Sequence, residues 1–114
     1  MKFAFLLYGD EAAEAALAPN ERRAIVEGHL AFTRMLVERD VLRFGEALAP
    51  SREAAVVRPR RRGVSDGPFA ETKEQLGGYY IVECANLDEA IEAAGRIPSL
   101  AAGGSVEVRP LIDM

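Results

Sequence analysis

The stretch "QLGGYYIVECA" (residues 75–85) has the strongest strand signal in the chain, and the fold can be worked out from it in both directions. Aromatic and β-branched residues predominate after the two glycines, which is typical of a strand. Gly77 and Gly78 at its start predict a bulge or a ligand close to the backbone. Because side chains alternate along a strand, the stretch has two faces, Tyr80, Val82 and Cys84 on one and Tyr79, Ile81 and Glu83 on the other.

A helix is predicted directly after this strand, and a longer one precedes it in the chain. Asn86 can cap the first turn of the later helix, and Glu89 can reach back toward the backbone in front of it. Pro98 ends that helix, because proline lacks the N–H that a helix interior needs. The longer helix is predicted for residues 20–39, where a stripe at steps of four, three and four is formed by Ile25, His29, Phe32 and Leu36.

Four further segments have the length and apolar content of strands, namely residues 2–8, 41–48, 53–59 and 105–112. The resulting order fits two βαβ-like halves. It predicts an α+β protein with a ferredoxin-like antiparallel sheet and both helices on one face. The face of the sheet without helices would include either the Tyr79 side or the Tyr80 side of that strand. It would also include residues such as Phe3, Phe5 or Leu7. Because such a surface is usually covered by a second subunit, we expect a homodimer.

The composition describes an ordinary globular chain. Its 114 residues are enough for a single domain spanning 1–114, with 49% apolar and 28% charged residues. The net charge of −4 argues against nucleic acid as the main partner. Cys84 is the single cysteine, which favours a reducing cytoplasm and rules out a cysteine zinc site within one chain. The apolar run from Phe3 to Tyr8 is too short for a signal sequence or a membrane span.

His29 is the single histidine, and its position in the predicted helix matters more than its number. It falls on the apolar stripe, so its ring is expected to face the sheet. One interpretation is a histidine at the edge of the core that bonds to backbone. The other is a general acid or base, because imidazole titrates near neutral pH.

The motif "SDGPFAETKEQLGG" (residues 65–78) supplies a candidate partner for that histidine. Asp66, Gly67 and Pro68 form a turn sequence in which the aspartate can accept bonds from the backbone. A plain turn does not explain why Phe69 and a run of polar residues follow. The candidate catalytic residues are therefore His29 and Asp66, and the candidate ligand-binding residues are Tyr8, Glu46, Ser65, Gly67, Pro68, Phe69, Glu71 and Lys73.

Other kinds of site have little support. One histidine without a cysteine pair disfavours zinc, and we expect no metal and no cofactor. The basic turn formed by Arg58 and residues 60–62 could suggest a nucleic-acid patch. It is better explained as a solvated hairpin tip, because the chain is acidic and no aromatic residues are interleaved.

Together, "YGDEAA", the helix with His29, "SDGPFAETKEQLGGYYIVE" and "SVEVRPL" resemble the YCII-related family, in the branch called DGPF-domain proteins. The resemblance extends over nearly the whole chain. It implies a ferredoxin-like, dimeric α/β barrel. It also implies a pocket on each subunit where His29 meets Asp66, suspected of acid–base catalysis, although the family's reaction is not established.

Two functions follow as hypotheses. The first is an enzyme without a cofactor that transfers protons on an unknown small molecule, in a lyase- or isomerase-like reaction. Here Asp66 would orient His29, with the two side chains about 3 Å apart or bridged by one water. The alternative is a non-catalytic ligand-binding or regulatory module, linked to transcription through a partner such as a sigma factor, which rests on analogy alone.

Overall fold

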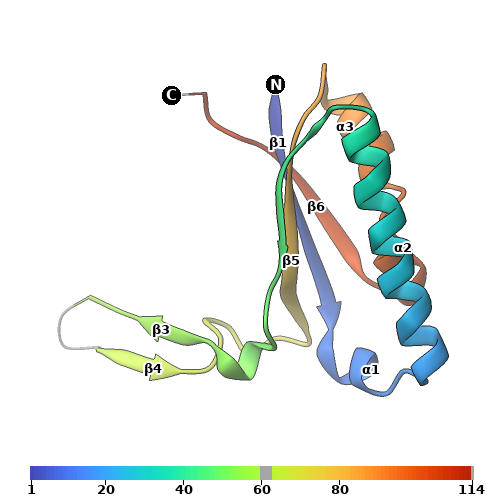
Figure 1. Cartoon of the computed structure of the whole chain (residues 1–114). Helices are drawn as coiled ribbons and strands as arrows, with labels where there is room; N and C mark the ends of the chain where they lie inside the picture. Colours follow the sequence, from blue (N-terminus) through green and yellow to red (C-terminus); the bar gives the residue numbers. More distant parts are fainter. Residues whose placement is uncertain (60–62, 114) are drawn as a thin grey trace.

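The computed structural model describes residues 1–59 and 63–113, and these form an α+β fold around one antiparallel sheet (Figure 1). The sheet has the strand order β2-β5-β1-β6. Its strands are β1 (Lys2–Asp10), β2 (Leu42–Ala47), β5 (Glu74–Glu83) and β6 (Ser105–Pro110). Helices α2 (Pro19–Glu38) and α3 (Leu87–Ala94) cover one face of it.

The order of these elements along the chain is β-α-β-β-α-β, as the sequence predicted for a ferredoxin-like sheet. The predicted α+β class, the antiparallel sheet and the placement of both helices on one face are confirmed. The described residues form an open sheet with β2 and β6 at its edges, and not a closed barrel. A barrel built from two copies therefore stays a prediction.

The glycine pair within β5 produces the bulge that the sequence predicted. Along the β1–β5 ladder, Leu7 is opposite Gly78 while Tyr8 is opposite Leu76, so Gly77 is the extra, unpaired residue. A Cβ on Gly78 would lie 3.1 Å from the carbonyl oxygen of Glu46, which explains the second glycine. The bulge bends β5 at the end of the sheet where the clefts described below open.

The core lies between the sheet and the helices, and its composition corrects one sequence-based expectation. Phe3 and Phe5 have no solvent exposure and pack under α2 and α3, and the partly buried Leu7 packs against the same core, so none of the three belongs to the uncovered face. The uncovered face instead takes the alternate residues, including Ala4 and Leu6. The expectation was wrong because β1 is apolar on both faces, and its pattern therefore does not show which face the helices cover.

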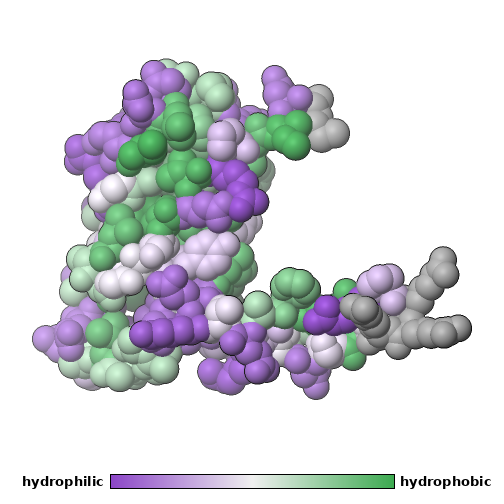
Figure 2. Space-filling model, turned by 180° about the vertical axis from the view of Figure 1, so that it is seen from behind, coloured by the Kyte–Doolittle hydropathy of each residue, from purple (hydrophilic) through white to green (hydrophobic). Residues whose placement is uncertain are grey.

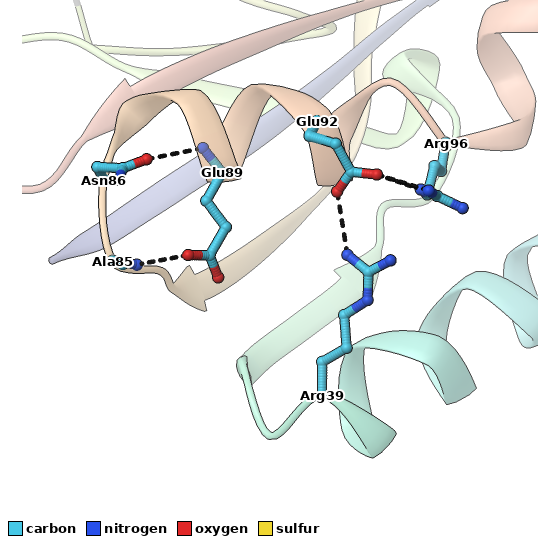
Figure 3. A network of polar contacts seen from close by, with 6 residues as sticks. All are labelled: Arg39, Ala85, Asn86, Glu89, Glu92 and Arg96. Carbon is cyan, nitrogen blue, oxygen red and sulfur yellow. Dashed lines mark hydrogen bonds and ion pairs between the residues drawn. The ribbon is translucent and has the colours of Figure 1, made fainter.

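Local hydrogen bonds form the start of α3. In α3, Asn86 Oδ1 accepts from the backbone N–H of Glu89 at 2.9 Å, and Glu89 Oε2 accepts from that of Ala85 at 3.2 Å (Figure 3). Glu92 also accepts from Arg39, at the end of α2, at 3.0 Å. In an exposed position this ion pair contributes little to stability, but it marks where the two helices meet. Before α2, Pro19 occupies the first turn and Ala18 provides no side-chain cap, as its residue type predicts.

The segment between β2 and β5 forms a hairpin arm that leaves the main sheet. Its strands β3 (Ala55–Val57) and β4 (Val64–Asp66) pair only with each other and project on the side away from the helices (Figure 1). The strand predicted for residues 53–59 is thus part of this arm and not of the main sheet. Asp66, expected at the start of the turn at residues 66–68, is instead the last residue of β4, and the chain bends at Gly67, whose φ is 91°. The basic tip predicted at residues 60–62 lies outside the described residues.

None of the helices in residues 1–59 and 63–113 combines the length and the apolar character that crossing a membrane requires.

Replacing Gly28 with alanine is expected to destabilise the protein, although alanine favours helices. A Cβ at this position in α2 would lie 2.9 Å from the ring carbons of Pro98, in the 3₁₀ segment η3 (Pro98–Ala102). Overpacking of this kind typically costs about 1–3 kcal/mol, against about 1 kcal/mol gained in helix propensity. Urea unfolding measures the net change in the free energy of unfolding. Gly95→Ala is the control, since its Cβ would meet only ordinary contacts at 3.5 Å; a Gly28→Ala protein at least as stable as wild type would contradict the prediction.

Candidate functional site

His29 lies in the middle of α2 and is held by a tyrosine of the sheet. Its Nδ1 is 3.0 Å from Tyr80 Oη, a hydrogen bond whose donor depends on the tautomer of the ring. The Tyr80 ring is fixed in turn by an edge-on contact with Phe32, with 5.2 Å between centroids. The helix stripe predicted from the sequence therefore does turn His29 toward the sheet, where the ring is half-buried.

Burial lowers the pKa of His29 below its ordinary value of 6.5, because the charged ring loses solvation. The imidazole is therefore mostly neutral at pH 7 and can accept a proton. The unfolded chain binds more protons than the folded chain between the lowered pKa and 6.5. This group consequently destabilises the fold as the pH falls through 6.5 and below.

Two adjoining clefts meet at His29. The α2 cleft has a volume of about 620 Å³ and lies between α2, the end of β1 and the segment around Ser51. The edge cleft has a volume of about 400 Å³ and lies between α2 and the ends of β2 and β5. Their shared wall is formed by Leu7, Val26, His29 and Gly77. The bulge of β5 and the histidine thus border the same space.

Two glutamates with opposite pKa shifts line the α2 cleft. Ser51 donates to Glu11 from its hydroxyl and, at 2.8 Å, from its backbone N–H, and these bonds lower the pKa of Glu11. Burial raises the pKa of Glu14, and the neighbouring carboxylates of Glu11 and Asp10 raise it further. Acidic groups with pKa values moved apart are a common feature of acid–base sites. Helix α1 (Glu11–Ala15), capped by Asp10, places both glutamates at the cleft.

A third cleft of about 670 Å³ lies at the base of the hairpin arm and is here called the hairpin cleft. Pro68 and Phe69 of the DGPF motif line it. It shares Tyr8, Pro50 and Ser51 with the α2 cleft, so the motif and His29 border adjacent spaces.

The predicted contact between His29 and Asp66 is not present in the described residues. Asp66 is exposed at the end of β4 and lines none of the three clefts, whereas His29 bonds Tyr80. The reason is the hairpin, which carries the aspartate away from the sheet on the side opposite the helices. A catalytic role for Asp66 stays a prediction.

The other candidate site residues of the motif, Ser65, Gly67, Glu71 and Lys73, serve the hairpin or face solvent. Gly67 has a φ of 91° and donates its N–H to the carbonyl of Ala54 at 2.6 Å, which closes the arm. Ser65 and Glu71 are exposed and line none of the clefts. Lys73 is 84% exposed and lies 3.9 Å from an oxygen of Asp10, so it does not turn inward.

Tyr8 and Glu46, the two predicted ligand-binding residues outside the motif, do line clefts. Tyr8 borders both the α2 cleft and the hairpin cleft, and Glu46 borders the edge cleft. A ligand in either place would touch one of them. Their binding role stays a prediction.

The sequence interpretation missed Tyr80 and Glu14. Tyr80 was assigned to a face of its strand, but its hydroxyl was not considered as a partner for His29. A tyrosine on a core face was the available signal, since a buried hydroxyl usually finds a hydrogen-bond partner. Glu14, in an alanine-rich segment, gave no comparable signal.

Within residues 1–59 and 63–113, no three histidine, cysteine, aspartate or glutamate side chains gather in a way that could hold a metal ion. The polar groups that border the clefts at His29 include Tyr80, Glu11, Glu14 and Arg52.

The fold and the site describe a small α+β domain with a histidine held by tyrosine at the junction of two clefts. Comparison with known proteins identifies its class. The YCII-related domain matches residues 1–114, so the chain belongs to the YCII-related family. It is similar to an uncharacterized protein of Rhizobium meliloti (strain 1021), with 40% identity over 114 residues that cover 97% of this chain and 92% of the relative.

Proposed function

We propose that the protein is an enzyme that transfers a proton on a small molecule bound in the α2 cleft, with His29 as the general acid or base. The observation that carries this proposal is the 3.0 Å bond between His29 Nδ1 and Tyr80 Oη at the wall shared by two clefts. A ring held at one nitrogen keeps the other nitrogen for a ligand. This is the arrangement that a general base requires.

The tautomer of His29 that donates to tyrosine is the one suited to act as a base. When Nδ1–H donates to Tyr80 Oη, Nε2 carries a lone pair and can take a proton from a substrate carbon or hydroxyl. The ring is then an imidazolium, and its Nε2–H can return the proton to another atom of the substrate as a general acid. The lowered pKa of His29 keeps the resting ring neutral at pH 7, so the base role comes first.

Glu14 is suited to exchange the second proton of such a reaction. Its raised pKa means that it keeps its proton to a higher pH than an ordinary glutamate. It lines the α2 cleft together with His29. A base and an acid that border one cleft can remove a proton at one atom of a ligand and add one at another, as an isomerase or a lyase does.

The lining of the α2 cleft points to a small ligand with both apolar and polar parts. Leu7, Ile25 and Val26 provide an apolar wall, while Tyr8 and Arg52 provide polar groups at other parts of the cleft. Its volume of about 620 Å³ falls in the range of small-molecule sites.

The proposal can be tested by NMR, because the chain has a single histidine and its ring signals are unambiguous. A pH titration is expected to give a pKa for His29 below 6.5, and Tyr80→Phe is expected to change the ¹⁵N shift of Nδ1. A metabolite library is then screened for compounds that move the His29 ring signals and are converted. Asp66→Asn, titrated in parallel, tests whether Asp66 affects the ring.

The outcomes of this screen separate the two functions. Conversion of a compound that also moves the His29 signals supports the enzyme. A compound that binds tightly at His29 and is not converted by the protein would support the non-catalytic binding module instead. A His29 pKa at or above 6.5, with no ligand that moves its signals, would contradict the proposed site.

A further inference from the structure

Among the described residues, four acidic or basic residues besides His29 line the α2 cleft, namely Glu11, Glu14, Arg22 and Arg52. Two of them are bonded to groups of the same chain. Glu11 accepts two hydrogen bonds from Ser51, one from its hydroxyl and one from its backbone N–H at 2.8 Å. Arg22 donates from Nη2 to the backbone carbonyls of Ala15 and Leu17, at 3.1 and 3.4 Å. Neither side chain needs a ligand as its partner.

Glu14 does not neutralise the remaining arginine. Its carboxyl lies against the backbone of Gly9, in the space that a Cβ on that residue would occupy. Its pKa is raised by burial first and then by the carboxylates of Glu11 and Asp10, and no described arginine offsets these effects. A glutamate held close to an arginine would have its pKa lowered instead. The positive charge of Arg52 is therefore not paired with Glu14.

Arg52 has no polar partner in the part of the chain that the structure describes. No ion pair and no side-chain hydrogen bond within residues 1–59 and 63–113 includes it. It is exposed in η1 (Ser51–Glu53), the turn that leads from β2 into the hairpin arm, and Figure 2 shows hydrophilic side chains gathered at the base of that arm. Its guanidinium is the cation that the cleft offers to a ligand.

The backbone that carries Arg52 is fixed at the cleft. Ser51 is bonded to Glu11, and its carbonyl accepts from the N–H of Ala54 at 3.0 Å, which closes the turn. The pKa of Glu11 is lowered mainly by its bonds to Ser51 and further by the charge of Arg52. The charge of Arg52 therefore acts on a group that lines the cleft.

We propose that the α2 cleft takes a small organic carboxylate as substrate and that Arg52 binds its carboxylate group. Because this names the class of molecule on which His29 acts, it rests on the proposed function. Arg52 and His29 come from different walls of the cleft, η1 and α2, so a ligand anchored at one can present another atom to the other. The planar guanidinium offers N–H donors that match the two oxygens of a carboxylate.

A carboxylate fits this cleft better than a phosphate does. Glu11 lines the same cleft, and its lowered pKa keeps it ionised at neutral pH. A phosphate monoester carries about twice the charge of a carboxylate at pH 7, so its repulsion by Glu11 is about twice as large. A single charge on the ligand matches the single charge of Arg52.

Benzoate and benzamide are the probes, because they have the same ring and nearly the same shape but differ in charge. Each is titrated into the full chain at pH 7, and the NMR signals of His29, the single histidine, report binding in the cleft. Benzoate is expected to bind at least about tenfold more tightly than benzamide, since a charge-assisted pair replaces a neutral contact. Arg52→Gln is expected to remove most of this difference and to leave benzamide binding unchanged. Phenyl phosphate is expected to bind more weakly than benzoate.

Arg34→Gln is the matched control, because it removes the same charge from an exposed position of α2 that lines none of the three clefts. It is expected to leave benzoate binding unchanged. The carboxylate site is overturned if benzamide or phenyl phosphate binds as tightly as benzoate, or if benzoate moves no His29 signal. It is also overturned if Arg52→Gln weakens benzoate binding no more than Arg34→Gln does. Circular dichroism verifies that both variants are folded.

These measurements report binding and not turnover, so the carboxylate class and the proposed function can fail separately. Loss of the preference for benzoate removes the carboxylate class and leaves proton transfer at His29 to be decided by the metabolite screen. A preference that depends on Arg52, with no carboxylate of the library converted, supports the site at Arg52 and contradicts the proposed enzyme.

Discussion

Replacing His29 with glutamine is expected to lower the rate of the catalysed reaction by about 10²- to 10⁴-fold, the usual contribution of a positioned general acid or base. Glutamine keeps a polar group near Tyr80 Oη but cannot exchange a proton near neutral pH. The measurement is the turnover of the compound found in the screen, at saturating concentration, so that the loss is assigned to kcat. Because the pKa of His29 is lowered by burial, the wild-type rate is expected to rise with pH to half its maximum below pH 6.5 if His29 is the base.

Two further variants test whether this loss of rate is specific to the imidazole of His29. Arg34→Gln changes an exposed residue of the same helix that lines none of the three clefts, and its rate is expected to match wild type. Tyr80→Phe removes the hydrogen bond to Nδ1 and is expected to lower the rate by less than His29→Gln does. A His29→Gln protein that is folded and retains more than about a tenth of the activity would exclude His29 as the general acid or base.

Phe5→Ala is expected to cost about 3–5 kcal/mol of unfolding free energy, the largest effect on stability of any substitution considered. Phe5 has no solvent exposure and lies in β1, between β5 and β6 and under the helices. Its truncation leaves a cavity that the central strand cannot close. The midpoint of urea unfolding measures the loss.

Leu6→Ala is the matched control one residue along the same strand. Leu6 faces the uncovered side and is partly exposed, so its truncation is expected to cost at most about half as much in the monomer. Equal costs at low protein concentration would contradict the assignment of the two faces. If a second copy covers Leu6, the cost of Leu6→Ala increases with protein concentration while that of Phe5→Ala does not.

Much of the fold could be predicted because its signals are local. The alternation of Tyr80 and Val82, the cap at Asn86 and the stripe of Phe32 and Leu36 each depend on residues a few positions apart. The structure has the corresponding strand, cap and helix. The bulge at the two glycines was predictable for the same reason, since glycine signals backbone geometry where it occurs.

The candidate site could be predicted only in part, because its partners come from distant parts of the chain. His29 and Tyr80 are 51 residues apart, and their bond depends on the register of β5 beneath α2. The pairing of His29 with Asp66 was inferred from residue types, but the hairpin separates the two in this chain. The local sequence pattern therefore specified the helices and strands, and it placed His29 on the side of α2 that faces the sheet. The tertiary structure decided two further features, namely which face of β1 packs in the core and which hydroxyl bonds to the imidazole. Both depend on contacts between helix, strand and hairpin, and no short stretch of sequence encodes such contacts.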